Sequence, residues 1–327
     1  MKKFELAEPQ TIDQLTAYLA QEKRQVMIMA GGTDLLGELK EELAEPDVVV
    51  DLRTIPNLAY IKKDEGAVRI GAMTTVAELG EDPMVKQDYP VLHQAANSVG
   101  SPQLRNMGTV GGNLCQRPRC WYYRDAQVVC RKKGGSKCFA FKGRNRYHAI
   151  FGGGMCYIVY PSDLAPALAT LNAELIINSP RGEKTVPLSD FYAPPSVNVH
   201  KENILGRDEI VLEIKIPLAK KDERSAYTKF IERGSWDFAV VSAAVAGTVS
   251  GKTFRDMRIV LGGVAPIPWR LQKVEEALKG KNLTEDLVKL AAREALKEAK
   301  PLEENAYKKD LVEVVLVRTV MSLIQAH

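Results

Sequence analysis

Hydrophobic residues along the first two thirds of the chain recur over short segments, some at helical spacing and some in runs typical of strands. Leu15, Leu19 and Ala20 repeat at helical spacing behind Thr11, a residue type that often caps a helix. The pattern predicts helices at 11–21, 75–79, 91–99 and 163–171. It predicts strands at 25–29, 48–51, 68–72, 157–160, 174–177, 209–216 and 226–230. The glycine-rich stretch 101–113 is expected to be an irregular loop.

The pattern changes after a polar break at 220–224. Two long apolar segments, 239–249 and 254–261, predict antiparallel strands joined by a turn. The helices expected to follow lie at 270–278, 284–298 and 309–325. A chain of 327 residues is long for one core. We therefore expect a mixed α+β cofactor domain at 1–220 and a smaller sheet-and-helix domain at 221–327.

Composition narrows the class of protein. The chain is 45% hydrophobic and 26% charged, as globular proteins are, and its net charge of +4 is too small to indicate a nucleic-acid or membrane binder. No run of about 18 apolar residues predicts a membrane span. The charged N-terminus is not followed by an apolar segment, so no signal peptide is expected. These features predict a cytoplasmic protein.

Two glycine-rich loops provide candidate anion-binding sites. The segment 30–36 (AGGTDLL) follows a predicted strand, and 109–113 (TVGGN) has similar ingredients. Adjacent glycines can expose successive backbone N–H groups to a phosphate. Neither loop matches the P-loop or the spaced Rossmann fingerprint. The pair suggests a pyrophosphate held between two backbones, whereas each loop alone is also explained as a tight turn.

All five cysteines fall within 42 consecutive residues. An odd, clustered set without a signal peptide favours metal or redox chemistry over disulfides. Four of them have nine, seven and seventeen residues between successive members, without the tight pairs usual in structural zinc sites. Wide spacing suits an iron–sulfur cluster, whose ligands attach to separate irons. The four are Cys120, Cys130, Cys138 and Cys156.

The charge around the cysteines supports an anionic group. Residues 116–148 contain ten Lys or Arg and one acid, so this stretch carries +9 and the rest of the chain −5. Such charge would offset an anionic cluster and raise its reduction potential. The alternative is a nucleic-acid patch, since Trp121, Tyr122, Tyr123 and Phe139 are interleaved with the basic residues. That alternative leaves the cysteines and the glycine loops unexplained, and we expect no nucleic-acid partner.

Several motifs of the chain resemble the flavin subunits of the xanthine dehydrogenase and carbon monoxide dehydrogenase family. They are both glycine loops, SPQLRN at 101–106, PSD at 161–163, LGGVA at 261–265 and PWR at 268–270. The resemblance covers nearly the whole chain. It implies an α+β fold: a two-lobed FAD-binding domain of the vanillyl-alcohol-oxidase (PCMH) type and a smaller C-terminal domain of the carbon monoxide dehydrogenase flavoprotein type. The lobes would span about 1–55 and 56–220, with a cysteine loop at 115–156.

The same resemblance implies which residues contact FAD. These are Met29, Ala30, Gly31, Gly32, Thr33, Asp34, Leu35, Leu36, Ser101, Thr109, Gly111, Gly112, Asn113, Asp163 and Lys229. Asp163 has a second explanation, as the N-cap of the helix that follows it. Both roles are compatible with the sequence.

Residues 113–124 (NLCQRPRCWYYR) resemble the cluster-bearing flavin subunits of 4-hydroxybenzoyl-CoA reductases and bacterial aldehyde oxidoreductases. This resemblance implies a 4Fe–4S cluster on Cys120, Cys130, Cys138 and Cys156. Cys115 is left outside the ligand set, as a small buried side chain beside the flavin loop.

No catalytic residue is expected in this chain, because its four histidines are scattered and no nucleophile–base motif stands out. The resemblance implies an electron-transfer subunit of an oxidoreductase, a molybdenum hydroxylase. Its partners would be a large molybdenum-cofactor subunit and a small 2Fe–2S subunit, with a ferredoxin or another electron carrier outside the complex. The alternatives are a stand-alone FAD-dependent reductase of the enolpyruvyl-UDP-sugar reductase type and a zinc-containing nucleic-acid module.

Overall fold

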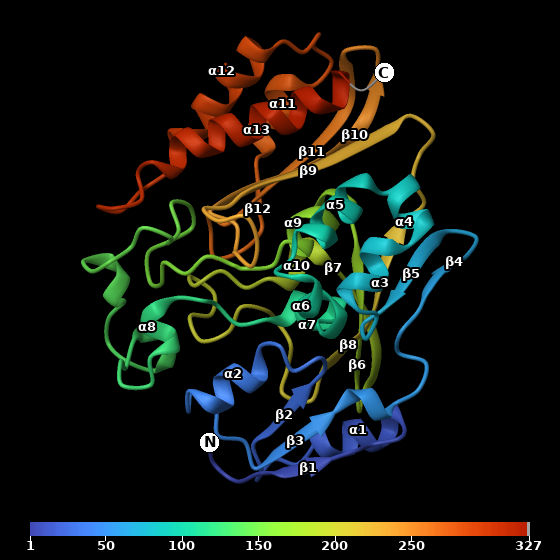
Figure 1. Cartoon of the computed structure of the whole chain (residues 1–327), viewed down its shortest axis with the longest axis vertical. Coiled ribbons are helices and arrows are strands. Elements are labelled where there is room, and N and C mark those ends of the chain that lie inside the picture. Colours follow the sequence, from blue (N-terminus) through green and yellow to red (C-terminus); the bar gives the residue numbers. More distant parts are fainter. Residues whose placement is uncertain (326–327) are drawn as a thin grey trace.

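The structure is a computed structural model, and it describes residues 1–325. Three sheets follow one another along the long axis of the molecule (Figure 1). The first is parallel, in the order β1-β3-β2, and its central strand is buried along its whole length. Its three consecutive valines suit this place, because helices or loops cover both faces of a parallel sheet. Its elements are β1 (Glu5–Ala7), α1 (Ile12–Leu19), β2 (Val26–Met29), α2 (Leu35–Lys40) and β3 (Val48–Asp51), followed by the 3-10 turn η1 (Leu52–Thr54).

The second sheet is antiparallel, in the order β4-β5-β8-β6-β7. Its strands are β4 (Ile61–Lys63), β5 (Ala67–Gly71), β6 (Glu174–Ser179), β7 (Gly182–Pro187) and β8 (Ile210–Pro217). The main core of the molecule lies between this sheet and the short helices that the chain inserts between its strands. These are α3 (Val76–Glu81), α4 (Pro83–Asp88), α5 (Pro90–Ser98), α6 (Pro102–Met107), α7 (Val110–Cys115), α9 (Leu164–Thr170) and α10 (Leu188–Phe191).

The third sheet is antiparallel, in the order β12-β11-β10-β9, and three helices cover one of its faces (Figure 1). Its other face packs against α5 and α9 of the preceding domain. This double burial explains why β10 is built largely from alanine and valine, since small side chains let two helical layers approach. The elements are β9 (Glu223–Phe230), β10 (Val241–Ser250), β11 (Thr253–Gly262), β12 (Trp269–Arg270), α11 (Gln272–Leu278), α12 (Glu285–Leu296) and α13 (Lys308–Gln325).

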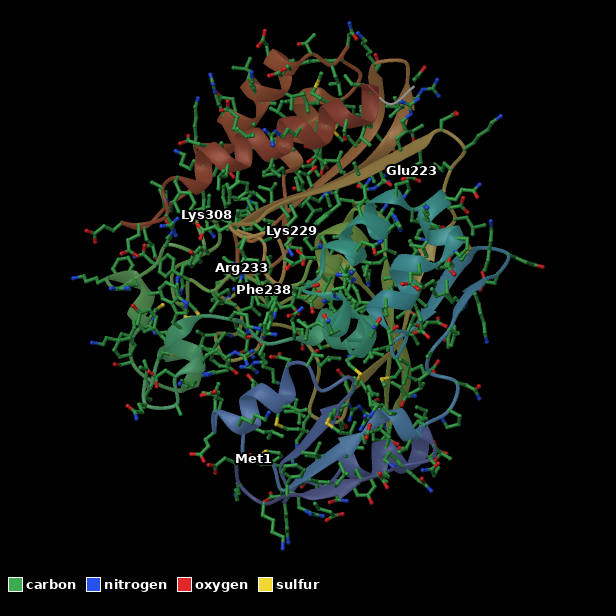
Figure 2. The ribbon with its side chains drawn as sticks, in the orientation of Figure 1. Met1, Glu223, Lys229, Arg233, Phe238 and Lys308 are labelled. Carbon is green, nitrogen blue, oxygen red and sulfur yellow. The ribbon has the colours of Figure 1, made fainter. Side chains whose placement is uncertain are left out.

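The cysteine loop (residues 115–156) forms a lobe at the side of the molecule, green in Figure 1, with little regular structure. Its elements after α7 are α8 (Trp121–Arg124) and the 3-10 turns η2 (Arg131–Lys133) and η3 (Phe139–Phe141). The start of α13 holds it: the buried Lys308 amine donates to the Tyr147 carbonyl at 2.8 Å and to the Gly263 carbonyl at 2.7 Å. Figure 2 shows Lys308 at this junction. The loop therefore bridges the two halves of the chain.

The α+β fold expected from the sequence is confirmed, and two local predictions are wrong. The stretch 101–113 contains two short helices, because Pro102 and the capping hydroxyls of Ser101 and Thr109 outweigh the glycines. The expected strand at 157–160 is extended but joins no sheet: it bonds once to Ala149 and once to Ala265.

The last two residues of the expected second domain, 326–327, lie outside the described residues. Within residues 1–325, no helix combines the length and apolar character that a membrane crossing requires.

Candidate functional site

A cavity of about 500 Å³ lies where the two glycine loops meet, within the size range of small-molecule sites. The first loop packs against the backbone just before the second loop. A Cβ on Gly31 would stand 1.7 Å from the Met107 carbonyl oxygen, so only glycine allows this approach. Gly32 has a φ of +72°, a conformation that other residues rarely adopt. The sequence thus brings segments 30–36 and 109–113 to one cavity, as expected of loops that share a ligand.

Hydrogen bonds fix the second glycine loop at the start of α7. The Thr109 hydroxyl accepts from the Gly112 backbone N–H at 3.1 Å and caps the helix. The Asn113 amide oxygen accepts from the Ser162 hydroxyl at 2.5 Å, which ties the loop to the start of α9. A Cβ on Gly111 would stand 2.8 Å from the Ala72 Cβ, so this turn also packs closely against the end of β5. The helix cap, the bond from Ser162 and the packing against Ala72 therefore fix the part of the cavity wall that the second glycine loop forms.

A buried acid lies at the same cavity. The Asp163 carboxylate accepts from the Tyr227 hydroxyl at 2.7 Å and from the Lys229 amine at 2.8 Å. Burial raises the pKa of Asp163, and the neighbouring Lys229 charge opposes this rise. Asp163 occupies the N-cap position of α9, as considered from the sequence, but its side chain makes no capping bond and the Ser162 hydroxyl accepts from the Ala165 N–H instead. The carboxylate is left to face the cavity and its two partners.

Most of the residues predicted to contact FAD line this cavity. They are Ala30, Gly31, Gly32, Thr33, Asp34, Leu35, Thr109, Gly111, Gly112, Asn113 and Asp163. The other four do not line it: Met29, Leu36, Ser101 and Lys229. The Ser101 hydroxyl caps α6. Lys229 does not line the cavity, but its amine donates to Asp163, which does.

Sequence reasoning missed several lining residues that come from distant segments. Among them are Leu104, Arg117, Arg119, Glu209, Trp236 and Phe238. Leu104 lies in the 101–106 motif, so that motif was a usable signal. Trp236 and Phe238 lie in an exposed turn between β9 and β10, and no local pattern marks them (Figure 2 labels Phe238).

The four predicted ligand cysteines line a second, small cavity together with Tyr122, Arg131, Lys132, Phe139 and Ile158. Cys115 lies elsewhere, in the wall of the large cavity, where burial raises its pKa to about 12. Among residues 1–325, no group of three or more His, Cys, Asp or Glu side chains is arranged to hold a single metal ion. The four sulfur atoms therefore share a cavity without forming a compact single-ion site.

Backbone N–H groups act on the pKa values of these thiols. Burial raises the pKa of Cys120 to about 11, and the backbone N–H groups of Tyr122 and Tyr123 oppose this rise. Cys138 and Cys156 are free thiols that interact directly. Their interaction lowers the pKa of Cys138 and raises the pKa of Cys156. The further backbone donors are Ala140, Phe141 and Tyr157 to Cys138, and Ile158 to Cys156. Converging N–H donors stabilise sulfur in its negatively charged, ligating form.

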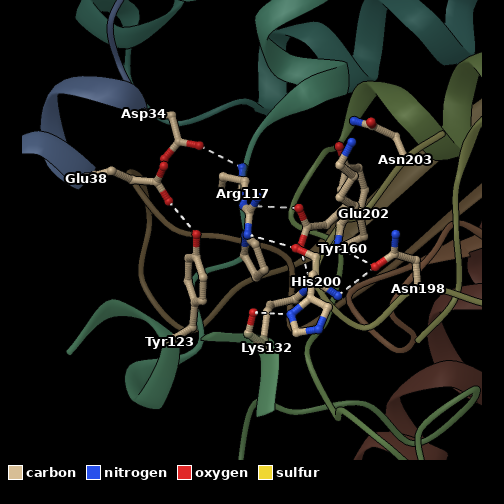
Figure 3. A network of polar contacts seen from close by, with 12 residues as sticks. Asp34, Glu38, Arg117, Tyr123, Lys132, Tyr160, Asn198, His200, Glu202 and Asn203 are labelled. Atoms are coloured by element: carbon tan, nitrogen blue, oxygen red, sulfur yellow. Dashed lines mark hydrogen bonds and ion pairs between the residues drawn. The ribbon is translucent and has the colours of Figure 1, made fainter. Parts of the chain in front are cut away.

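A chain of charged side chains connects the two cavities (Figure 3). Asp34, at the first glycine loop, accepts from the Arg117 backbone N–H and from the Arg124 guanidinium, each at 2.7 Å. Arg117 in turn forms an ion pair with Glu202, at 3.1 Å between Nε and Oε2. Glu202 also pairs with the buried Lys132 of the cysteine cavity. Asp34 thus lines the large cavity while its carboxylate holds the cysteine loop.

Carboxylates of other segments neutralise half of the basic residues of 116–148. Asp34, Glu38, Glu202 and Glu232 are the acids, and the paired bases are Arg117, Arg119, Arg124, Lys132 and Arg146. The excess positive charge around the cysteines is therefore smaller than the sequence suggests. Arg131 and Lys132 are the basic residues that line the cysteine cavity itself.

Comparison with known proteins gives two family matches. Residues 2–219 match the FAD binding domain in molybdopterin dehydrogenase, and residues 225–323 match the CO dehydrogenase flavoprotein C-terminal domain. The chain is 36% identical to the aldehyde oxidoreductase FAD-binding subunit PaoB of Escherichia coli K12 over 253 residues, 76% of this chain and 78% of that protein. It is 28% identical to the carbon monoxide dehydrogenase medium chain of Hydrogenophaga pseudoflava, over 92% of this chain and 89% of that one.

Solved structures agree with these matches. A carbon monoxide dehydrogenase chain from Hydrogenophaga pseudoflava superposes with a TM-score of 0.77 at 26% identity, covering 98% of this chain and 97% of that chain. Quinoline 2-oxidoreductase from Pseudomonas putida 86 has the same fold, with a TM-score of 0.78 at 24% identity and 99% of each chain covered.

Proposed function

The chain belongs to the family of FAD-binding medium subunits of molybdenum hydroxylases, the flavoprotein subunits of oxidoreductase complexes, and from this premise we propose how its two cavities are used. FAD occupies the large cavity between the glycine loops. A 4Fe–4S cluster occupies the cysteine cavity. The subunit passes electrons between its partners and an external acceptor or donor.

The observation that carries the FAD site is the contact of the two glycine loops at one cavity. The close backbone approach at Gly31 and the N–H groups of the first loop suit a pyrophosphate, because peptide N–H donors bind phosphate oxygens without a bulky side chain between them. The N–H groups of residues 110–113 already donate to acceptors within the protein, so the second loop contributes the wall of the cavity. Asp163, held by Tyr227 and Lys229, offers a carboxylate to the N–H or hydroxyl groups of the cofactor. These residues bind and orient; the bound flavin itself supplies one- and two-electron chemistry.

The partners follow from the relatives. One relative is named as an FAD-binding subunit and another as a medium chain, which are names for parts of complexes. We propose that this chain assembles with a large molybdenum-cofactor subunit and a small 2Fe–2S subunit. The division at 220/221 then separates the cofactor domain from the C-terminal domain.

The cluster proposal rests on the cysteine cavity. Four thiols of the cysteine loop converge on it, and backbone N–H groups near Cys120, Cys138 and Cys156 favour the charged form of each sulfur. A cubane attaches its ligands to four separate irons, so its sulfur ligands stand farther apart than those of one zinc ion. The four cysteines that line one cavity supply the four ligands that such a cluster needs. A cluster here provides a one-electron step toward a ferredoxin or a similar carrier.

Metal and flavin analysis of the complex purified under anaerobic conditions tests both sites. We expect one FAD and about four irons on this subunit beyond those of the 2Fe–2S subunit. Cys130→Ser should lose these irons and keep FAD. Cys115→Ser is the matched control, because Cys115 lines the other cavity, and it should keep the irons. One zinc with no extra iron would contradict the cluster, and absence of flavin would contradict the FAD site.

A further inference from the structure

A histidine lies against the cysteine cavity. His148 is buried, with 4% of its surface exposed, and its Nε2 is 3.2 Å from the Cys120 sulfur. The contact joins residues 28 positions apart, so the fold and not the local chain geometry creates it. The proposed binding of FAD and a cluster does not use this side chain.

The imidazole is held in place by its surroundings. The His148 backbone N–H donates to the Asn145 carbonyl at 2.9 Å, and its own carbonyl accepts from the Asn305 amide at 3.0 Å. The rings of Trp121 and Tyr122 pack around the imidazole, with centroids 5.9 and 6.3 Å away. A side chain fixed by the backbone, by two rings and by the C-terminal domain keeps its direction toward the sulfur.

The second ring nitrogen decides the direction of the hydrogen bond. Within the described residues, His148 Nδ1 is buried and has no hydrogen-bond partner. A proton on Nδ1 would leave a buried donor without an acceptor, whereas a proton on Nε2 gives the donor a sulfur to bind. The neutral tautomer with Nε2–H is therefore favoured, and it donates to Cys120.

We propose that His148 is a positioning residue that donates its Nε2–H to the Cys120 sulfur and raises the reduction potential of the iron–sulfur cluster held there. The inference rests on the proposed cluster. A hydrogen bond to a ligand sulfur withdraws negative charge from it. Reduction adds one electron to an already anionic site, so the donor stabilises the reduced form more than the oxidised form.

The test compares two variants of His148 in the purified complex. His148→Phe keeps a ring of similar size but removes the donor. His148→Gln restores an N–H group near the position of Nε2. His93→Phe is the matched control, since His93 lies on α5 and bonds to the Gly80 carbonyl instead of a cysteine. Iron and FAD contents are measured first, and the potential is then measured by redox titration followed by electron paramagnetic resonance.

We expect His148→Phe to lower the potential, with the reduction equilibrium changed by about tenfold or more, equivalent to 59 mV or more for one electron. His148→Gln should remain close to the unsubstituted protein, and His93→Phe should show no shift. Loss of iron from His148→Phe alone, with iron kept by His148→Gln, would also support the donor.

Three results would overturn the inference. If both variants keep iron and neither shifts the potential, the hydrogen bond has no influence. If both lose iron, the imidazole acts through packing or ligation and not through its N–H group. If the unsubstituted subunit holds no cluster, the proposed function fails first, and the iron analysis reveals this before any titration.

Discussion

Glu202 pairs with Arg117 of the large cavity and with Lys132 of the cysteine cavity, which makes its removal an informative perturbation. Its side chain is 3% exposed and faces Lys132, whose side chain is 2% exposed, and Arg117, at 32%. Glu202→Gln keeps the shape and removes the charge. Lys132 then faces neutral acceptors, the introduced amide oxygen and the Val199 carbonyl at 2.9 Å. A buried ammonium is left without a counter-charge.

The magnitude follows from burial. Removing one partner of a buried ion pair costs about 3–5 kcal/mol, because the other charge remains desolvated. The pair with Arg117 adds less, because its side chain is one third exposed and partly screened by water, although the Nε that faces Glu202 is buried. We therefore expect Glu202→Gln to destabilise the cysteine loop by about 3–5 kcal/mol. That is a large share of the roughly 5–15 kcal/mol that stabilises a typical domain.

A local assay is needed, because a chain with two domains does not have to unfold in one step. Hydrogen exchange measured by mass spectrometry on peptides covering 128–141 reports the free energy of opening of this segment. The double variant Lys132→Met/Glu202→Gln should be more stable than Glu202→Gln alone, since the unpaired ammonium is gone. A loss below about 1 kcal/mol in Glu202→Gln, or simple additivity in the double variant, would refute the reasoning.

Three further predictions use other buried groups. Gly31→Ala should weaken FAD binding by about tenfold or more, because its Cβ would collide with a backbone carbonyl of the facing segment; Gly37→Ala, which has open space, should bind normally in the same fluorescence titration. Burial lowers the pKa of Lys308 to about 7, so between pH 7 and about 10 the unfolded chain binds a proton that the folded chain lacks, and stability should rise with pH. Urea unfolding at several pH values measures this dependence, and the free energy of unfolding of Lys308→Met should lack the rise with pH. If the variant and the unsubstituted protein show the same dependence on pH, the prediction for Lys308 is wrong. Lys229→Met leaves Asp163 without its cation and should lower the free energy of unfolding by about 3–5 kcal/mol. Adding Asp163→Asn should restore part of this loss. Equal stability of the single and double variants would show that the pair is not coupled.

The sequence located the parts of the site that depend on local chemistry. Adjacent glycines after a strand, and cysteines clustered in one loop, mark candidate sites through residue type. Their assignment to FAD and to a cluster came from the family resemblance and stays a prediction. The structure brings both glycine loops to one cavity and the four cysteines to another. The short helices at 102–107 and 110–115 were missed because their glycines were weighed more heavily than the capping residues Ser101 and Thr109.

What the sequence did not reveal depends on contacts between distant segments. Asp34 was assigned to the cofactor, yet its carboxylate binds the cysteine loop through Arg117, 83 residues later. The aromatic residues Trp236 and Phe238 reach the large cavity from a turn of the third sheet. Half of the basic residues near the cysteines pair with acids whose position only the fold determines. Net charge along the chain therefore overestimates the local field.

The cysteine loop depends on these contacts because it has little core of its own. Between α7 and residue 156 its regular structure is one four-residue helix and two 3-10 turns. The apolar cluster at its cavity consists of Cys156, Ile158 and Val199, with Cys120 packed against it. So little apolar burial does not offset the entropy of ordering some forty residues, at roughly 1–2 kcal/mol each. Buried ion pairs and the junction with α13 supply part of the difference. A cluster bound to four cysteines would supply more, so its binding and the folding of this loop are expected to be one coupled process.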